Sequence, residues 1–407
     1  MNIERPRLLV MSSTFPRWAD DPEPPFVFEL SRRLTERFDV TVLTPRSPGS
    51  RERERMDNID VIRFGYFIRR WENLASHSGG ILVRLRHNPL NYVLVPPFLL
   101  GELASCSRLL RRQRFDLIHA HWLVPQGLVA VVARRMAGVP LPLVTTAHGA
   151  DLFALRGRVF DALRRLVVVE SAQVSVVSTA MRDRLIVGGT EADKIQVIPM
   201  GADLQARFTP DARVLRNKHE LLFVGRLVEK KGVRILIEAL PDVLRTHPAA
   251  RVTVVGDGPL APDLRALTAR LCVSGHCRFL GMIPQAQLPD LYRRATLLAA
   301  PFVVAASGDQ EGLGLVQAEA AGCGCPVIAG DVPAVHDAIV HGESGLLVPP
   351  GGAQAMAAAI RRLLDDQKLR ERLARNARQH CMAAFDWESV AARYGNLLTE
   401  AMQSAQR

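Results

Sequence analysis

Two carboxylates, Glu311 and Glu319, lie eight residues apart in the stretch SGDQEGLGLVQAEAAGCGCPVIAG, residues 307–330. The Leu, Val, Gln and Ala residues between and around them predict a helix from Gly312 to Cys323. Such a helix would place Glu319 about two turns inside it and Glu311 just before its first residue. Both carboxylates would then face the same ligand.

The start of this predicted helix is suited to an anion. The backbone N–H groups of Gly312, Leu313 and Gly314 would open the helix, where its dipole favours a phosphate or a departing group that gains negative charge. The simpler alternative is that Glu311 caps the helix and Glu319 lies on a solvated face. For an isolated pair of glutamates that alternative is the more common one.

A second group of charged residues lies in GRLVEKKG, residues 225–232, directly after a predicted strand. Arg226 offers a planar guanidinium to phosphate oxygens, and Lys231 offers a point charge. With a helix that begins near Lys231, they would stabilise a diphosphate, and more strongly as it departs. Taken alone, the turn is more typical of a solvated basic loop.

A histidine follows a predicted strand in TTAHGAD, residues 145–151. A lone histidine is more often structural than catalytic, but ligands of open α/β sheets bind beyond the carboxyl ends of the strands, where His148 is expected. The nearby HAHWLVPQG, residues 119–127, begins within the preceding predicted strand and is expected in the same region.

The order of elements predicts two doubly wound halves, because short apolar strands alternate with helical runs as in parallel sheets covered on both faces. In the N-terminal half the predicted strands are 7–12, 39–44, 60–64, 115–121, 143–147, 173–178 and 195–199, and the helices 26–37, 126–137 and 159–170. In the C-terminal half the strands are 221–225, 251–255, 278–280, 297–300 and 326–329, and the helices 232–245, 262–271, 287–294, 312–323 and 353–364. A length of 407 residues also predicts two domains.

Composition is that of an ordinary globular protein, with 48% hydrophobic and 23% charged residues. The first apolar run is too short for a secretory signal, and the longest apolar stretch, Tyr92 to Leu100, is interrupted by Pro96 and Pro97, so no membrane span is expected. The six cysteines form no paired knuckles, and we expect reduced, mostly buried thiols. These features predict a cytoplasmic protein.

The net charge of +11 is concentrated in one segment, Arg63 to Arg114, which holds nine arginines and only two acids, Glu72 and Glu102. Aromatic and aliphatic residues accompany the arginines. This combination favours an anionic membrane surface, or docking of an acidic or lipid-linked substrate. A nucleic acid is the rival partner, although no nucleic-acid-binding motif is visible, and a solvated arginine-rich face is an equally good alternative.

Two of these motifs resemble the signature of family 4 glycosyltransferases. E-x7-E runs into a strand beginning PVIAG, and G-R-L-x-x-x-K-G lies about eighty residues before it, in the order and at the separation expected for the family. The resemblance reaches from the first strand to the end segment FDWESVAARYGNLL, which is similar to the family's final helix. It departs after the first strand, where FPRWADDPEPPFVFEL replaces a Gly-Gly loop, and after PVIAG, where Pro333-Ala334 and His336-Asp337 stand in place of Gly-Gly and Pro-Glu.

The resemblance implies an α/β protein of GT-B fold, with two Rossmann-like doubly wound parallel-sheet domains facing across a cleft. It implies an N-terminal, acceptor-side domain at 1–200, a nucleotide-sugar-binding domain at 201–385, and a C-terminal helix at 386–407 that crosses back to the N-terminal domain. The implied activity is transfer of a hexosyl-type sugar from a nucleoside diphosphate sugar, with retention at the anomeric carbon, no cofactor and no metal.

The resemblance also implies a role for each candidate residue. Arg226 and Lys231 would hold the donor diphosphate, with the main chain of Gly312, Leu313 and Gly314 beside them. Glu319 would accept hydrogen bonds from the ribose. Glu311 would contact the donor sugar and stabilise positive charge on its ring, and His148 would do so from the opposite wall.

Two other classes of function remain as alternatives. A nucleotide-sugar epimerase or hydrolase on the same scaffold would turn over the donor without an acceptor, and a non-catalytic protein would only bind it. For a transferase, the expected acceptor is a glycan or a lipid-linked molecule in cell-envelope or extracellular polysaccharide synthesis. The protein would then be cytoplasmic, or peripheral on the inner face of the plasma membrane, with no nucleic acid as partner.

Overall fold

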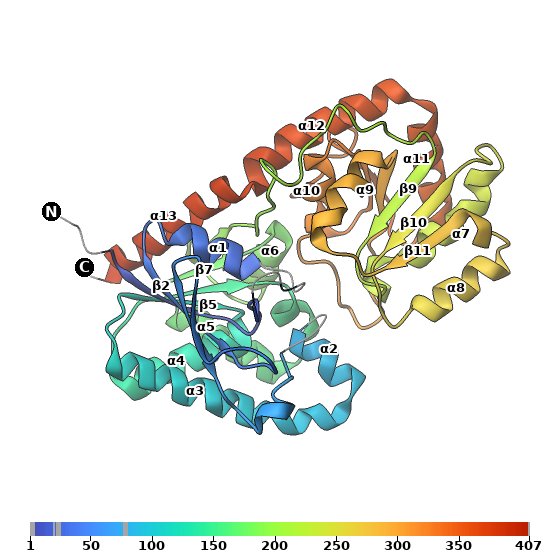
Figure 1. Cartoon of the computed structure of the whole chain (residues 1–407). Helices are drawn as coiled ribbons and strands as arrows, with labels where there is room; N and C mark the ends of the chain where they lie inside the picture. The colour runs from blue at the N-terminus through green and yellow to red at the C-terminus, as the bar shows by residue number, and fades with distance from the viewer. Residues whose placement is uncertain (1–4, 19–20, 22–25, 76–79, 406–407) are drawn as a thin grey trace. The chain divides into compact units, whose positions relative to one another are not determined.

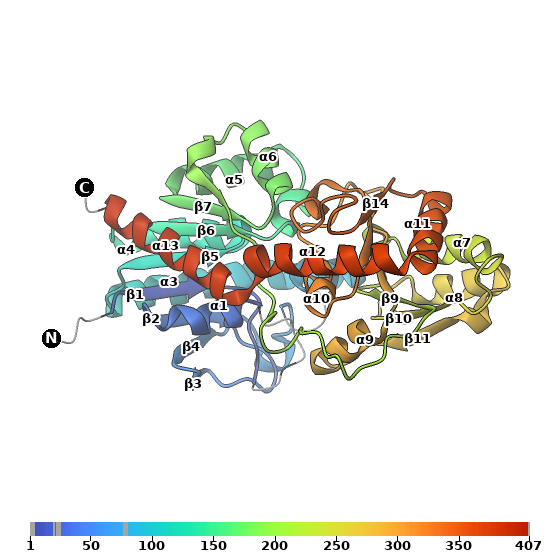
Figure 2. The same ribbon diagram turned by 90° about the horizontal axis from the view of Figure 1, so that it is seen from above.

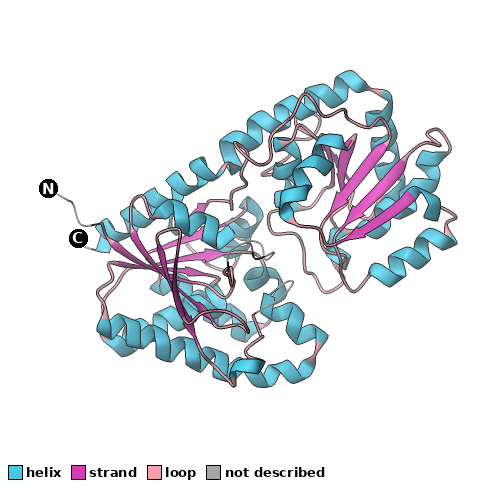
Figure 3. Ribbon diagram, viewed as in Figure 1, coloured by secondary structure: helices cyan, strands magenta, loops and turns pink. Residues whose placement is uncertain are grey.

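The computed structural model describes residues 5–18, 21, 26–75 and 80–405. The chain divides into two compact units. We call Met1–Val177, Met181–Ile198 and Ala391–Arg407 the N-terminal unit, and Ser178–Ala180 and Pro199–Val390 the C-terminal unit. Each unit is a sheet with helices on both faces (Figures 1 and 3). Because the boundary falls within the last helix, the end of the chain belongs to the same unit as its beginning.

The N-terminal unit contains an eight-stranded sheet in the order β3-β4-β2-β1-β5-β6-β7-β8. All neighbours are parallel except β3 and β4. The strands are β1 (Arg7–Met11), β2 (Asp39–Pro45), β3 (Arg53–Met56), β4 (Ile59–Phe64), β5 (Leu117–His121), β6 (Leu143–Ala147), β7 (Gln173–Val176) and β8 (Ile195–Val197). β5 and β6 are buried along their whole length, as expected for strands covered on both faces.

The helices of this unit include two that lie side by side, α3 and α4 (Figure 2). They contribute Phe98, Cys106 and Val129 to a core beneath the sheet. The helices are α1 (Phe26–Leu34), α2 (Gly80–His87), α3 (Val95–Arg112), α4 (Leu128–Ala137), α5 (Arg158–Glu170) and α6 (Thr179–Val187). The last helix, α13 (Trp387–Ala405), is held to this unit by Tyr394, whose hydroxyl donates to Ile198 O at 3.1 Å.

The C-terminal unit contains a six-stranded, entirely parallel sheet in the order β11-β10-β9-β12-β13-β14. This is the strand order of a doubly wound nucleotide-binding sheet. From β9 the chain adds strands toward β11 on one side, and from β12 it adds them toward β14 on the other, so the strand order switches between β9 and β12. The strands are β9 (Glu220–Val224), β10 (Arg251–Val255), β11 (Cys277–Gly281), β12 (Leu297–Ala300), β13 (Val327–Gly330) and β14 (Leu346–Val348). The helices are α7 (Val233–Leu244), α8 (Ala261–Arg270), α9 (Leu288–Arg294), α10 (Leu315–Gly322), α11 (Ala353–Asp365) and α12 (Gln367–Phe385).

The expectation that Pro96 and Pro97 interrupt the apolar stretch is wrong. Both lie in the first turn of α3, where a proline costs no hydrogen bond because the first N–H groups of a helix have no partner within it. Over the described residues, Pro89–Arg112 is therefore long and apolar enough to cross a membrane by length and composition alone. In this structure one face of α3 packs into the core, where Phe98, Leu109 and Leu110 are buried.

Candidate active site

The predicted site residues of the C-terminal unit lie near the switch in strand order between β9 and β12. The turn after β9 contains Arg226 and Lys231, and the loop after β12 leads through Glu311 to α10. Since β9 and β12 are adjacent parallel strands, their carboxyl ends meet at one edge, where doubly wound sheets bind ligands. Residues about eighty positions apart in the sequence are brought together in this way.

A close contact of two main-chain segments joins the turn to the loop. Gly232 has a φ of +66°, and a Cβ atom on it would stand 1.8 Å from Pro301 O. Only glycine satisfies both the conformation and the contact. The turn is a short 3-10 helix, Glu229–Lys231, and α7 begins at Val233, two residues after Lys231.

Lys231 and Glu311 form an ion pair at this junction, with 2.6 Å between Nζ and Oε2 and only 15% and 12% of their side chains exposed. Lys231 Nζ also lies 5.0 Å from the centre of the Phe302 ring. Burial by itself would raise the pKa of Glu311, but the charges of Lys231 and Lys230 and the Gly314 N–H outweigh it and lower the pKa to about 2. Glu311 is therefore an anion throughout the physiological range.

Further contacts beside the Lys231–Glu311 pair connect the turn after β9 to the loop after β12. Lys230 Nζ lies 3.2 Å from Asp309 Oδ1 and donates to Gln310 O. Glu229 accepts a hydrogen bond from Ala306 N at 2.8 Å. Turn and loop are thus joined by several charged contacts, and the extra base of the motif, Lys230, has a structural partner.

The predicted helix start is wrong by three residues. Gly314 has a φ of +72°, in the left-handed region, and α10 begins only at Leu315. Gly312, Leu313 and Gly314 therefore precede the helix and do not open it, because a left-handed residue interrupts the helical hydrogen-bond pattern. The Gly314 N–H donates to Glu311 Oε1 at 3.2 Å, and Leu313 is buried. Glu319 consequently lies little more than one turn into the helix.

Glu319 is buried and held by an aromatic hydroxyl. Tyr292 on α9 is completely buried and donates to Glu319 Oε2 at 2.9 Å. Burial raises the pKa of Glu319 to about 7, against the opposing effects of Tyr292, Arg207 and Gln285. The carboxyl is thus partly protonated near neutral pH.

Arg226, another predicted site residue, follows Gly225 in the turn after β9 and is half-buried.

His148, the remaining predicted residue, belongs to the N-terminal unit, at the end of β6. Its Nε2 lies 2.9 Å from His121 Nδ1, and its ring packs against Phe26 and Trp122. Burial, with a smaller effect of His119, lowers the pKa of His148 to about 3. The ring is therefore neutral at pH 7 and takes part in a hydrogen bond as one tautomer or the other.

The loops after β5 and β6 are tied together by one buried carboxylate. Asp151 accepts hydrogen bonds from the backbone N–H groups of Leu123, His148 and Gly149 at 2.9 to 3.1 Å. Asp151 could have been proposed from the sequence, because it lies only three residues after His148 in the motif HGAD. Tyr292 gives no such signal, because it comes from another helix and reaches Glu319 only through the packing of α9 on α10.

Among the described residues no three His, Cys, Asp or Glu side chains are grouped so that they could hold a metal ion. Cationic side chains act on both glutamates, Lys231 and Lys230 on Glu311, and Arg207 and Lys231 on Glu319.

Two family models together match most of the chain. Residues 25–206 match Glycosyltransferase Family 4, and residues 208–380 match Glycosyl transferases group 1. A glycogen synthase of Mycobacterium tuberculosis is 34% identical over 291 residues, covering 69% of this chain and 68% of that protein. A GDP-mannose-dependent alpha-(1-6)-phosphatidylinositol monomannoside mannosyltransferase of Mycolicibacterium smegmatis is 27% identical over 392 residues, covering 94% of both chains.

Solved structures share the fold over nearly the whole length. A sucrose-phosphate synthase from Thermosynechococcus elongatus superposes with a TM-score of 0.76 at 23% identity, covering 98% of this chain and 100% of that one. The Anabaena protein Alr3699/HepE, in complex with UDP and glucose, has a TM-score of 0.73 at 20% identity, covering 97% and 100%. The predicted fold is therefore confirmed: the chain belongs to glycosyltransferase family 4, and its two parallel-sheet units have the GT-B fold.

Proposed function

We propose that this glycosyltransferase moves a hexosyl-type sugar from a nucleoside diphosphate sugar to a glycan or lipid-linked acceptor, with retention at the anomeric carbon and without a metal. The observation that carries the proposal is the Lys231–Glu311 pair beside Glu319 at the switch in strand order of the second sheet. A lysine and two carboxylates in that place suit a ligand that has both a diphosphate and sugar hydroxyls.

Donor binding is assigned to the turn and loop of the C-terminal unit. Arg226 and Lys231 would neutralise the diphosphate, the task that a divalent cation performs elsewhere. Glu319, held by Tyr292, would accept hydrogen bonds from the ribose. The relatives support a nucleotide-sugar donor, since one is named for GDP-mannose and one solved structure contains UDP. They do not agree on the base.

In the proposed reaction, the bond between the anomeric carbon and the diphosphate oxygen breaks while the acceptor oxygen bonds to the same carbon. The acceptor hydroxyl proton passes to the departing diphosphate. Glu311 is ionised, because its pKa is about 2, and therefore acts as an anion that accepts from sugar hydroxyls and stabilises positive charge on the ring. His148, neutral at pH 7, is proposed as a hydrogen-bonding partner of the donor sugar.

The acceptor and the location belong to the same proposal. Two relatives act, by their names, on glycogen and on a phosphatidylinositol mannoside, so both a glycan and a lipid-linked acceptor have a precedent in the family. We assign the protein to the cytoplasmic side, where nucleotide sugars are made, in cell-envelope or extracellular polysaccharide synthesis.

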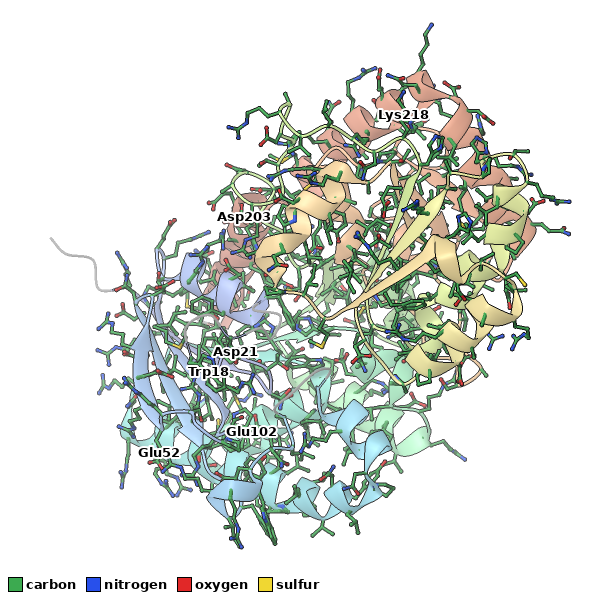
Figure 4. The ribbon with its side chains drawn as sticks, turned by 45° about the vertical axis from the view of Figure 1, so that its right-hand side comes forward. Trp18, Asp21, Glu52, Glu102, Asp203 and Lys218 are labelled. Carbon is green, nitrogen blue, oxygen red and sulfur yellow. The ribbon has the colours of Figure 1, made fainter. Side chains whose placement is uncertain are left out.

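The first test is a binding screen without added metal. The purified protein is measured by thermal shift and calorimetry against UDP, GDP, ADP and their common sugars, beside Glu319→Ala and Lys231→Ala. Lys218→Ala is the matched control, because Lys218 is exposed in the same unit and outside the turn (Figure 4). One nucleotide that binds the wild type and the control, but neither site variant, is the expected result.

The chemistry is tested with the donor so identified. NMR of the product should show the anomeric configuration of the donor, and turnover should persist in EDTA. An inverted product or a metal requirement would refute that part of the proposal. Turnover of the donor without any acceptor would instead favour an epimerase or hydrolase, and binding without turnover a non-catalytic protein.

A further inference from the structure

The N-terminal unit exposes large apolar side chains on three pieces of chain. These are the loop after β4 with its short helix Arg69–Trp71, the short helix Pro89–Leu94, and the first turns of α3. Six of them are at least half exposed, from 50% for Trp71 to 78% for Leu90: Ile68, Trp71, Leu90, Tyr92, Val93 and Leu100. We call these six residues, with Arg69 and Arg70, the apolar-basic surface.

The first turns of α3 adjoin both of the other pieces. Phe67 stacks on Trp71 with 5.9 Å between ring centres, and it shares a shallow hollow with Pro97 and Leu100. Gly101 brings α3 against the loop, because a Cβ atom there would stand 2.7 Å from Gly65 O. The helix Pro89–Leu94 continues directly into α3. The exposed side chains therefore lie on adjoining elements.

The charge of this surface is positive, and within the described part of the chain neither Arg69 nor Arg70 forms an ion pair with an acid. Arg69 and Arg70 are exposed, and Arg70 lies 5.3 Å from the Trp71 ring centre. The sequence from Gly65 to Gly101 contains a single acid, Glu72. Glu72 is completely buried and bound to Arg46, so it contributes no exposed negative charge.

The structure changes which arginines of the basic segment matter. Arg63 is buried, and its guanidinium binds Glu54 and the carbonyl of Pro16. Arg111, at the far end of α3, donates to Met136 O at 2.7 Å. The side chain of Arg86 lies outside the described residues. Exposed arginines and exposed apolar residues coincide only around Arg69 and Arg70, over the part of the segment that the structure describes.

We propose that the apolar-basic surface docks the protein on a bilayer that contains anionic lipids. Tryptophan and tyrosine favour the headgroup level of a membrane, aliphatic side chains such as Ile68 and Leu90 enter the acyl boundary, and arginines bind lipid phosphates. A nucleic acid would use the arginines but gain little from the aliphatic residues. The inference deepens the proposed function, since docking brings the enzyme to a lipid-linked acceptor, but it does not depend on the transfer reaction.

The test is flotation of the full-length protein with vesicles of phosphatidylcholine, with and without phosphatidylglycerol. The wild type should bind the anionic vesicles, and less so at high salt. Arg69→Gln/Arg70→Gln should weaken that binding by roughly fivefold for each arginine. Ile68→Ser/Leu90→Ser should weaken binding to both kinds of vesicle by about tenfold.

Matched controls remove the same groups elsewhere on the N-terminal unit. Arg53→Gln/Arg55→Gln takes two exposed arginines from β3, and Val187→Ser takes an exposed aliphatic side chain from α6. Neither should change vesicle binding. A wild type that stays unbound, or controls that lose as much binding as the surface variants, would overturn the proposal. So would surface variants that alter self-association or binding to an RNA oligonucleotide in place of vesicle binding.

Thermal shift with UDP, GDP and ADP on the same variants separates the two proposals. Vesicle binding lost with nucleotide binding unchanged supports the docking surface. If no nucleotide binds while the vesicle results are as expected, the donor site is wrong and the docking surface is unaffected.

Discussion

Tyr292 donates its hydroxyl hydrogen to Glu319 Oε2 across 2.9 Å, and this hydrogen bond opposes the rise in the pKa of Glu319 that burial causes. A phenol from α9 thereby sets both the position and the charge of a carboxyl on α10. The pair makes the ionisation of Glu319, near pH 7, a property of the packing between two helices.

Tyr292→Phe should shift the pH dependence of donor binding. Without the hydroxyl the pKa of Glu319 rises further, so the carboxylate needed for ribose hydroxyls forms only at higher pH. Losing a hydrogen bond to a charged group costs about 1.5 to 3 kcal/mol, so binding near neutral pH should fall by roughly tenfold or more and recover as pH rises. Calorimetry with the bound nucleotide across this range measures the midpoint.

Tyr394→Phe is the matched control for that experiment. Tyr394 is also a fully buried tyrosine with a hydrogen-bonded hydroxyl, but it lies in the N-terminal unit. Tyr394→Phe should lower the melting temperature without moving the pH midpoint of nucleotide binding. An unmoved midpoint in Tyr292→Phe would mean that Tyr292 serves packing alone.

Lys231→Met should destabilise the C-terminal unit by about 3 kcal/mol, because it leaves the Glu311 carboxylate buried without its main partner. Lys231→Met/Glu311→Gln should recover most of that loss, since neither partner is then charged, yet it should not bind donor. Denaturant unfolding of the single and double variants gives the coupling energy. Strictly additive single and double effects would show that the pair is not coupled.

Glu102 in α3 should make the N-terminal unit less stable in alkali. The carboxyl is completely buried inside this unit (Figure 4), and burial raises its pKa from an ordinary 4.5 to about 8. Its contribution to stability is therefore full below pH 4.5 and lost as pH rises through 8. The loss is roughly 1.4 kcal/mol for each unit of pKa difference, and Glu102→Gln should abolish it.

Tryptophan fluorescence follows this unit selectively, since Trp18, Trp71 and Trp122 belong to it and only Trp387 to the other. The melting temperatures of the wild type and Glu102→Gln, plotted against pH, should agree at mildly acidic pH and separate at alkaline pH. Parallel curves would exclude Glu102 as the cause.

His119 should give the opposite dependence. Burial lowers its pKa from 6.5 to about 3, so its contribution is full above pH 6.5 and lost as pH falls toward 3. Its Nε2 lies 2.7 Å from Thr146 Oγ1, a contact that a glutamine amide can replace. His119→Gln should therefore reduce the loss of stability in acid without abolishing it, because the pKa values of His121 and His148 are lowered as well. The alkaline side of the melting profile should not change, and a change there would contradict this assignment.

The sequence predicted most strands of both sheets, because parallel strands covered on both faces are continuous apolar runs, and strands such as 143–147 and 251–255 have the predicted bounds. It also assigned Lys231 and Glu311 to one donor site, although only through a family motif, and it did not predict their ion pair. Their contact depends on β9 and β12 being neighbours, which no local pattern states.

Other features depend on tertiary structure and were missed or misplaced. The start of α10 was placed too early because the left-handed conformation of Gly314 cannot be read from a glycine-rich run. The break expected at Pro96 and Pro97 is a helix start. The basic segment looked uniform, but packing buries Arg63 and leaves Arg69 and Arg70 exposed.

Glu72 fixes the conformation of the loop after β4, which contains Phe67. It accepts hydrogen bonds from Tyr66 N at 2.6 Å and Phe67 N at 3.0 Å while it binds Arg46. The loop is therefore pre-organised: its conformational entropy is lost when the protein folds and does not have to be lost again when a bilayer is bound. Glu72→Ala removes no side chain of the apolar-basic surface, yet it should weaken vesicle binding, because the loosened loop must then be ordered at the membrane.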